Sequence, residues 1–271
     1  IMLDVKGDVA GLLPASVRPL FAGETTLTGS AVATTAGPVQ IEGLNASATG
    51  FGLALVGTLD PAAKTADLSF DLVGGQAETY AAFVPGIAWK DWRLHAKVNG
   101  ALARPNVDAE VTATGLGAHG YGSDRLDLAL NTDATGSDLA FKLVGSAEGL
   151  TAAESKVSTA LGKTATFAIK GALGDAGPNI TDATIRLTPL DLAFSGAAGP
   201  SGAKGALHLT RLDLAAFSGL ASRPLSGTIA LDGTIDTGDH YSAIALDLNG
   251  SAHDVATAVA LADSFLKGET R

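Results

Sequence analysis

The chain has 271 residues, enough for one large domain or two small ones. Its 28 acidic residues outnumber 18 basic ones, and this net charge of −10 excludes the basic surface that nucleic-acid binding requires. The lack of cysteine excludes disulfides, thiolate catalysis and metal sites with cysteine ligands. Glycine accounts for 34 residues and charged residues for only 17%, a composition that favours many short strands separated by turns.

Alternation of apolar and polar residues is the main pattern along the chain. Successive side chains of a strand point to opposite faces, so each alternating segment predicts a strand with one apolar and one polar face. In the first half, weaker segments cover residues 53–59, 68–72, 94–98 and 107–111. In the second half, the clear segments cover residues 126–131, 139–143, 167–170, 185–187, 190–194, 229–232 and 244–248, with a weaker one at 207–209.

Three stretches predict short helices between the strands. Residues 76–84 end at Pro85, which stops a helix. Residues 212–220 carry leucine and alanine at helical spacing, and residues 251–267 carry Val255 and three later apolar residues at the same spacing. No long helix separates the strands, so parallel pairing through helical crossovers is disfavoured and a mainly antiparallel arrangement is expected.

The strands need a way to bury their apolar faces. Two packed sheets, a closed barrel or a sheet curled into a trough would each do so. No break in composition separates two sandwiches, and we therefore expect an all-β fold: a long, curled, mainly antiparallel sheet that forms a hydrophobic trough, with a few short helices. Residues 1–271 would form one continuous segment with no internal domain boundary, and we expect it to be an excerpt of a longer chain.

Motifs that would indicate an enzyme are weak. Residues 115–120 match G-x-G-x-x-G, but a turn and a strand are predicted after them where a dinucleotide site needs a helix. The five histidines are not paired at metal-binding spacing, and His95 and His208 fall on the polar faces of their strands. The sequence contains no nucleophile-elbow, P-loop or zinc-protease motif.

One acidic cluster and one aromatic pair are candidates for a calcium site and a carbohydrate site, respectively. Asp232, Asp236, Asp239 and His240 do not match the spacing of a calcium loop and are better explained by a polar turn. The two tryptophans, at positions 89 and 92, are expected in one loop as a local anchor, where a carbohydrate-active enzyme would need aromatic platforms and converging carboxylates. We therefore expect no enzyme, no catalytic residue, no metal and no cofactor.

Several short segments resemble the TamB family, the inner-membrane subunit of the translocation and assembly module. Residues 98–111 resemble the G-x-L-x-x-P-x-V/L step that recurs in these proteins. Residues 212–220, followed by the Pro-Leu-Ser-Gly of 224–227, resemble their helical turn and re-entering strand, and the Gly-Glu-Thr junctions at Gly23 and Gly268 fit as well. The chain thus resembles an internal fragment of a TamB-like protein, related to the AsmA-like and bridge-like lipid transfer proteins.

The resemblance implies a fold, a location and partners. The fold would be a β-taco, a trough that carries phospholipid acyl chains across the periplasm of a Gram-negative bacterium. The full-length protein would be anchored in the inner membrane and would meet an outer-membrane barrel of the TamA/BamA type. Its implied roles are lipid transport, outer membrane biogenesis and support for outer-membrane protein assembly and protein secretion.

The apolar faces of the clear strands are the candidate lining of such a groove. The residues concerned are Leu126, Leu128, Leu130, Leu139, Phe141, Leu143, Phe167, Ile169, Ile185, Leu187, Leu190, Leu192, Phe194, Ile229, Leu231, Ile244, Leu246 and Leu248. A structural or adhesive β-repeat protein of the bacterial surface is the alternative. It would share the glycine content and acidity, but it should show tighter periodicity and stacked Asn or Asp turns.

Overall fold

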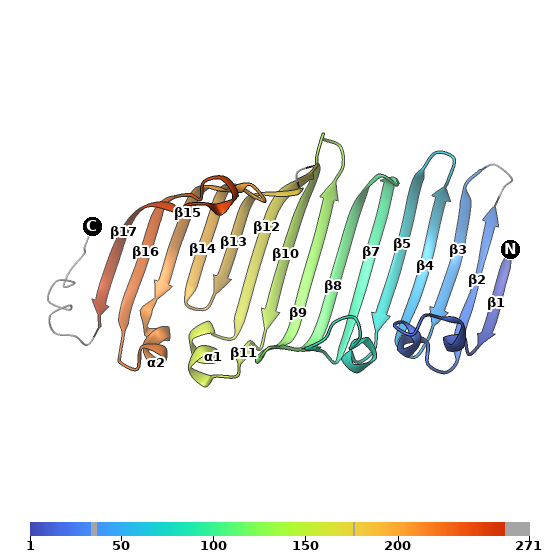
Figure 1. Cartoon of the computed structure of the whole chain (residues 1–271), viewed down its shortest axis with the longest axis horizontal. Helices are drawn as coiled ribbons and strands as arrows, with labels where there is room; N and C mark the ends of the chain where they lie inside the picture. The colour runs from blue at the N-terminus through green and yellow to red at the C-terminus, as the bar shows by residue number, and fades with distance from the viewer. Residues whose placement is uncertain (34–36, 176, 258–271) are drawn as a thin grey trace. The chain divides into compact units, whose positions relative to one another are not determined.

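The protein is described here by a computed structural model covering residues 1–33, 37–175 and 177–257 (Figure 1). Neighbouring strands pair antiparallel, and the helices are few and short, which confirms the predicted all-β fold class. The chain divides into two compact units. Unit 1 comprises Ile1–His119 and Ser123–Gly136, and unit 2 comprises Gly120–Gly122 and Ser137–Arg271. Among the described residues, no helix is long and apolar enough to span a membrane.

Unit 1 is an antiparallel sheet in which strands follow one another in nearly sequential order. Its strands are β1 (Met2–Gly7), β2 (Thr25–Ala33), β3 (Val39–Ser47), β4 (Phe51–Asp60), β5 (Thr65–Gly74), β6 (Ile87–Ala88), β7 (Asp91–Ala101), β8 (Arg104–Ala118) and β9 (Tyr121–Asp133). β5 pairs with β7, while the short β6 pairs with the end of β8. Three 3₁₀ turns lie at one end of the strands: η1 (Ala10–Leu12), η2 (Arg18–Phe21) and η3 (Ala77–Tyr80).

Unit 2 repeats this arrangement. Its strands are β10 (Leu139–Glu148), β11 (Thr151–Ala152), β12 (Thr164–Gly174), β13 (Gly177–Leu187), β14 (Leu190–Gly199), β15 (Gly202–Asp213), β16 (Ser226–Asp236) and β17 (Ala245–Ala256). The helical segments are α1 (Ser155–Leu161), η4 (Leu214–Phe217), α2 (Ser218–Ala221) and η5 (Asp239–Tyr241). β11 pairs with Tyr121 and Gly122, the first two residues of β9, which belong to unit 2. From β12 to β17 each strand pairs with the next in sequence.

Each alternating segment of the sequence lies in a strand, because alternation suits a sheet with one apolar and one polar face. Residues 190–194 lie in β14, for example, and residues 68–72 lie in β5. Register shifts interrupt the pairing at a few points, such as between Leu209 and Leu212 of β15. β3 was not predicted, because Gly43 and a register shift between Ile41 and Leu44 break its alternation.

Two of the expected helices are shorter in the structure. Within residues 76–84, only Ala77–Tyr80 forms a 3₁₀ helix. Within residues 212–220, β15 continues to Asp213 and the remainder divides between η4 and the single turn of α2.

The predicted helix over residues 251–267 is wrong where the structure describes it. Residues 251–256 belong to β17, which pairs with β16 along its length. The helical spacing that began at Val255 competes with the period-two alternation that begins at Leu246, and cross-strand pairing favours the latter. Residues 258–267 of this expected helix lie outside the described residues.

The expectation that both tryptophans lie in one loop is also wrong. Trp89 follows β6 directly, but Trp92 is the second residue of β7 and shares a sheet face with Leu94. The two rings nevertheless gather around one residue, since their centroids lie 5.6 and 6.1 Å from that of Tyr80. The pair is thus a packing anchor that joins the η3 turn to the sheet.

Candidate functional site

The register of unit 1 places apolar side chains in rows that run across the strands. Residues directly opposite one another in an antiparallel pair point to the same face. One row consists of Val5, Leu27, Ala46, Leu53, Leu72, Leu94 and Val111. It crosses β1 to β8 without a charged residue. The next row along the strands includes Leu3, Leu44, Leu55, Phe70 and Ala96.

Unit 2 has three such rows, each crossing the sheet from β10 to β17. The first is Ala147, Ala165, Leu187, Leu190, Leu212, Ile229 and Ala252. The second is Gly145, Phe167, Ile185, Leu192, Leu209, Leu231 and Gly250. The third is Leu143, Ile169, Ala183, Phe194, Leu207, Gly233 and Leu248. We call the faces that carry these rows the apolar faces of the two units.

Two hydrogen bonds place the leucines of β9 on the apolar face of unit 1. Thr112, on the polar face of β8, donates to Asp127 at 2.8 Å, and Asn131 donates to Asp108 of the same face at 2.9 Å. Since Asp127 and Asn131 therefore point to the polar face, the residues that alternate with them point the other way. These are the candidate lining residues Leu126, Leu128 and Leu130.

The other candidate lining residues lie in unit 2, and all but one share its apolar face. Leu139 and Phe141 alternate with Leu143 on β10, and Leu246 pairs with Ile235 two residues before Leu248. Ile244 is the exception, because it precedes β17 and is 71% exposed. Sequence reasoning missed the contribution of β15, whose three leucines occupy one position in each row. It also missed the contribution of β1 to β8 of unit 1 to the lining, although the weaker alternation had predicted β4, β5, β7 and β8 as strands.

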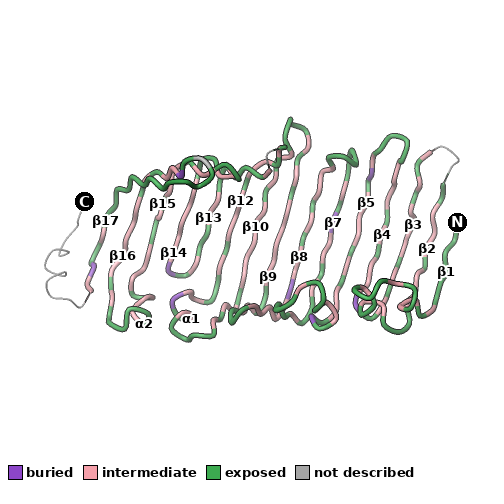
Figure 2. Tube along the Cα trace, viewed as in Figure 1, coloured by how far each residue is buried: buried purple, intermediate pink, exposed green. Residues whose placement is uncertain are grey.

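The apolar faces are not covered as a protein core is. No large side chain among the described residues is fully buried, and the buried hydrophobic residues are small ones such as Ala96 and Ala160, with one valine (Figure 2). Ile185 remains 40% exposed although it lies on a central strand. The accessible surface is 15,913 Å², whereas about 11,000 Å² is typical of a folded monomer of this size. A sandwich would bury these rows between two sheets, so the burial pattern disfavours it.

Glycines make the apolar face of unit 2 smooth. A β-carbon added at Gly171 would overlap the ring of Phe141 on the neighbouring strand, and one at Gly205 would overlap the ring of Phe194. At Gly233 it would overlap the side chain of Leu248. Large side chains therefore lie flat over glycines of adjacent strands, which fills the rows without raising ridges across them.

The opposite faces carry charged side chains in cross-strand pairs. His95 contacts Asp71 at 3.0 Å and His208 contacts Asp232 at 2.6 Å, which confirms that both histidines lie on polar faces. Arg125 donates to both carboxylate oxygens of Asp127, at 2.7 and 2.8 Å, and so lowers the pKa of that carboxyl. Exposed pairs of this kind contribute little stability and mainly keep the face hydrated.

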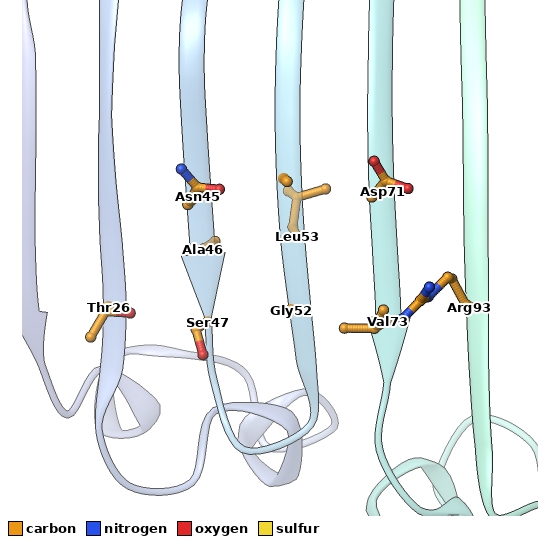
Figure 3. Close-up of a pocket in the computed structure, with 10 residues that line it drawn as sticks. Thr26, Asn45, Ala46, Ser47, Gly52, Leu53, Asp71, Val73 and Arg93 are labelled. Atoms are coloured by element: carbon orange, nitrogen blue, oxygen red, sulfur yellow. The ribbon is translucent and has the colours of Figure 1, made fainter.

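A hollow of about 450 Å³ lies on the polar face of unit 1 (Figure 3). It forms where Gly52 and Ala54 of β4 have little or no side chain, between Ser47 of β3 and Val73 of β5. Arg93 of β7 also lines it and extends toward Val73. Because it lies on the face opposite the apolar rows, it is separate from the candidate groove.

The other sequence motifs have structural roles. Residues 115–118 are the end of β8, and a strand, β9, begins at Tyr121, so the G-x-G-x-x-G match lies in a strand–turn–strand segment as expected. Asp232 and Asp236 are held apart by pairing with His208 and Lys204 on β15. Within the part of the chain that the structure describes, no three acidic or histidine side chains gather as a metal site would require.

Aromatic side chains close one end of the apolar face of unit 1. Phe51 lies beside Phe21 of η2, with ring centroids 5.1 Å apart. The Tyr80 hydroxyl donates to the carbonyl of Gly50 at 2.5 Å, and Trp89 Nε1 donates to the carbonyl of Gly75 at 2.9 Å. These bonds direct the polar atoms toward the backbone and leave the rings as an apolar border at the strand ends.

The chain was compared with family models, curated proteins and solved structures. No family model, no curated protein and no solved structure matches it.

Proposed function

We propose that the apolar faces bind the acyl chains of phospholipids, and that the chain is a lipid-transport segment of a TamB-like bridge. In this proposal the full-length protein spans the periplasm of a Gram-negative bacterium from an inner-membrane anchor toward an outer-membrane barrel. It carries phospholipid and thereby supports outer-membrane protein assembly. The resemblance of residues 98–111 and 212–227 to the TamB family supports the assignment of family and location.

The observation that carries the proposal is the set of three charge-free rows in unit 2. Each row crosses seven strands, a distance of about 29 Å at ~4.8 Å per strand. An extended fatty-acid chain can therefore lie along a row, perpendicular to the strands. Every strand crossed offers another apolar or glycine position, so a chain that slides along the row meets no charge.

The energetics favour this occupant. Removing a CH₂ group from water contributes about 0.8 kcal/mol, so a chain of roughly fourteen such groups gains about 11 kcal/mol when fully covered. The same gain is available at each position along a row, so the free energy of a bound acyl chain changes little as the chain slides along it. A single polar interruption on a row would therefore act as a barrier.

Two matched triple variants test the proposal. The first places arginine on the apolar face, as Leu128→Arg, Leu192→Arg and Leu246→Arg together. The second places arginine on the polar face of the same strands, as Ala129→Arg, Ala193→Arg and Ala245→Arg. Both add the same charge to β9, β14 and β17, but to opposite faces.

Uptake of a fluorescent phospholipid is then measured for the wild type and both variants, with circular dichroism to follow β-content. We expect the polar-face variant to bind like the wild type and the apolar-face variant to lose at least tenfold in uptake while it keeps its strands. Equal uptake by the two variants would refute the proposal. Unfolding of the apolar-face variant alone would mean that the face is a packed core, and would favour the structural surface protein.

A further inference from the structure

A hollow of about 340 Å³ lies at the helix-bearing end of unit 2, and its lining is distinct from both sheet faces. Hydroxyl groups of Thr151, Ser155, Ser158 and Thr159 line it together with Lys163. Ala152 and Ala153 complete the lining, and no carboxylate takes part in it. The hollow thus combines one positive charge with four hydroxyl groups, three of which have a proton free to donate, and such donors suit a phosphate oxygen.

The polar groups of this hollow are available to a ligand. In the described part of the chain, the Lys163 ammonium makes no hydrogen bond or ion pair, and the same holds for the hydroxyls of Thr151, Ser155 and Ser158. Thr159 already donates its hydroxyl proton to the carbonyl of Ser155 at 3.0 Å, so the ammonium and the other three hydroxyls are the donors left for a ligand.

Two contacts fix the position of Lys163. The Leu150 amide donates to the Lys163 carbonyl at 3.1 Å, which holds the backbone beside the end of β10. The preceding Gly162 packs against Thr188, where a β-carbon would overlap the threonine side chain, and the Thr188 carbonyl accepts from Arg211 at 2.6 Å. Arg211 is therefore a second cation on the same border of unit 2.

The hollow adjoins the end of the apolar face. Ala165 belongs to the first row, and Lys163 stands two residues before it. Thr164 is the first residue of β12, so Lys163 stands at the strand end beside that row. A lipid whose acyl chain lay along the row would have its glycerol and headgroup at this border, within reach of the ammonium.

We propose that this hollow binds the phosphate group of the phospholipid whose acyl chains occupy the apolar face of unit 2. The inference rests on the proposed function and deepens it, because it makes the phosphate a determinant of which lipid is carried. A neutral diacylglycerol has the same acyl chains and no phosphate. The protein should therefore prefer a phospholipid to a diacylglycerol of identical chains.

The test measures uptake of a fluorescent phospholipid and of the diacylglycerol with the same labelled chain. It uses the wild type, Lys163→Gln, and Lys170→Gln as the matched control. Lys170 lies on β12, the strand that follows Lys163, and stands on the polar face opposite Lys142 and Asp182. We expect the wild type and Lys170→Gln to prefer phospholipid by about tenfold, the value of one charge-assisted hydrogen-bonded contact. Lys163→Gln should lose that preference and bind diacylglycerol unchanged.

Four results would overturn the inference, and they are distinguishable. If the wild type takes up both lipids equally, or if Lys163→Gln keeps the preference, the phosphate site is refuted while the groove stands. If neither lipid is taken up, the proposed function itself fails. Competition with inorganic phosphate shows whether the hollow binds a lipid phosphate or free phosphate. If inorganic phosphate reduces the uptake of phospholipid but not that of diacylglycerol, the result supports a lipid phosphate. If the ³¹P signal of inorganic phosphate broadens with the protein but phosphate competes with neither lipid, the hollow is a site for free phosphate and the lipid assignment is refuted.

Discussion

Trp92 on β7 lies across Gly74 on β5, so that the indole occupies the space where a side chain at position 74 would stand. The glycine lets the ring lie flat between Phe51 and Ala113, its neighbours in the same row. Similar pairs of a large residue and a glycine recur on the apolar face of unit 2. They explain why a chain with 34 glycines can form long, regular strands.

Gly74→Ala should destabilise unit 1 by displacing this ring. Overpacking of this kind costs about 1–3 kcal/mol. Gly43→Ala on β3 is the matched control, because nothing lies within 4 Å of the added β-carbon there. Urea unfolding followed by tryptophan fluorescence should show a lower midpoint and a shifted native spectrum for Gly74→Ala only. An unchanged spectrum would show that the ring does not depend on the glycine.

Ile185→Arg should be tolerated if the apolar face is open. A charge confined without a partner in a closed core costs about 3–5 kcal/mol, but an arginine on an uncovered face can extend into water. We expect the free energy of unfolding to change by less than about 1 kcal/mol, as for other exposed positions. Thr184→Arg, on the polar face of the same strand, is the control. A loss several times larger for Ile185→Arg would mean that a second layer covers the face.

Tyr80→Phe should weaken the aromatic border of unit 1. The variant loses the hydrogen bond to the Gly50 carbonyl, but that carbonyl keeps the Gly75 amide as a donor, so we expect a cost of about 1 kcal/mol. Burial raises the pKa of Tyr80. Its contribution is thus fully present below the unfolded pKa, about 10, and is lost as the pH rises through the higher folded value.

Chemical unfolding at neutral and at alkaline pH measures both effects of the Tyr80 change. Tyr241→Phe serves as the control, since its hydroxyl donates to the Gly199 carbonyl at 3.0 Å from an exposed ring. If the two variants lose the same stability, or if Tyr80→Phe leaves the alkaline dependence unchanged, burial of Tyr80 does not contribute as described.

Asp127→Asn should reduce the acid sensitivity of unit 1. Arg125 and Thr112 hold the pKa of Asp127 below its ordinary value, so the unfolded chain binds the proton first as the pH falls. The contribution of this carboxylate is therefore present above about pH 4 and is lost as the pH falls through the lower folded value. Urea unfolding between about pH 6 and about pH 3 should show a shallower decline for the variant. A parallel decline would contradict this account.

Alternation was sufficient to predict the strands from β4 onward, apart from the two-residue β6 and β11, because it depends only on neighbours in sequence. Segments 139–143 and 190–194 were recognised in this way, and so were the faces of His95 and His208. The rows could not be predicted from the sequence, because a one-residue change of register reverses the face of an entire strand. The bulge in β15 is such a case: Leu209 and Leu212 occupy adjacent rows only because β15 has one more residue than β16 between their partners, Leu231 and Ile229.

The failures have physical causes as well. Apolar residues from Val255 onward have helical spacing, but residues 251–256 form a strand because they pair with β16. Trp92 was placed in a loop because Pro85 and Gly86 stand close by, whereas the turn ends before the strand begins at Asp91. The hollow at Lys163 had no sequence signal, since its hydroxyl residues come from β11 and α1, which the fold alone brings together.

Native mass spectrometry of the purified chain, followed by organic extraction and lipid identification, tests the central claim most directly. Our account predicts at least one phospholipid bound per chain, absent from the Leu128→Arg, Leu192→Arg, Leu246→Arg variant and present in its polar-face counterpart. A lipid-free mass for the wild type, with no uptake of added phospholipid, would contradict it.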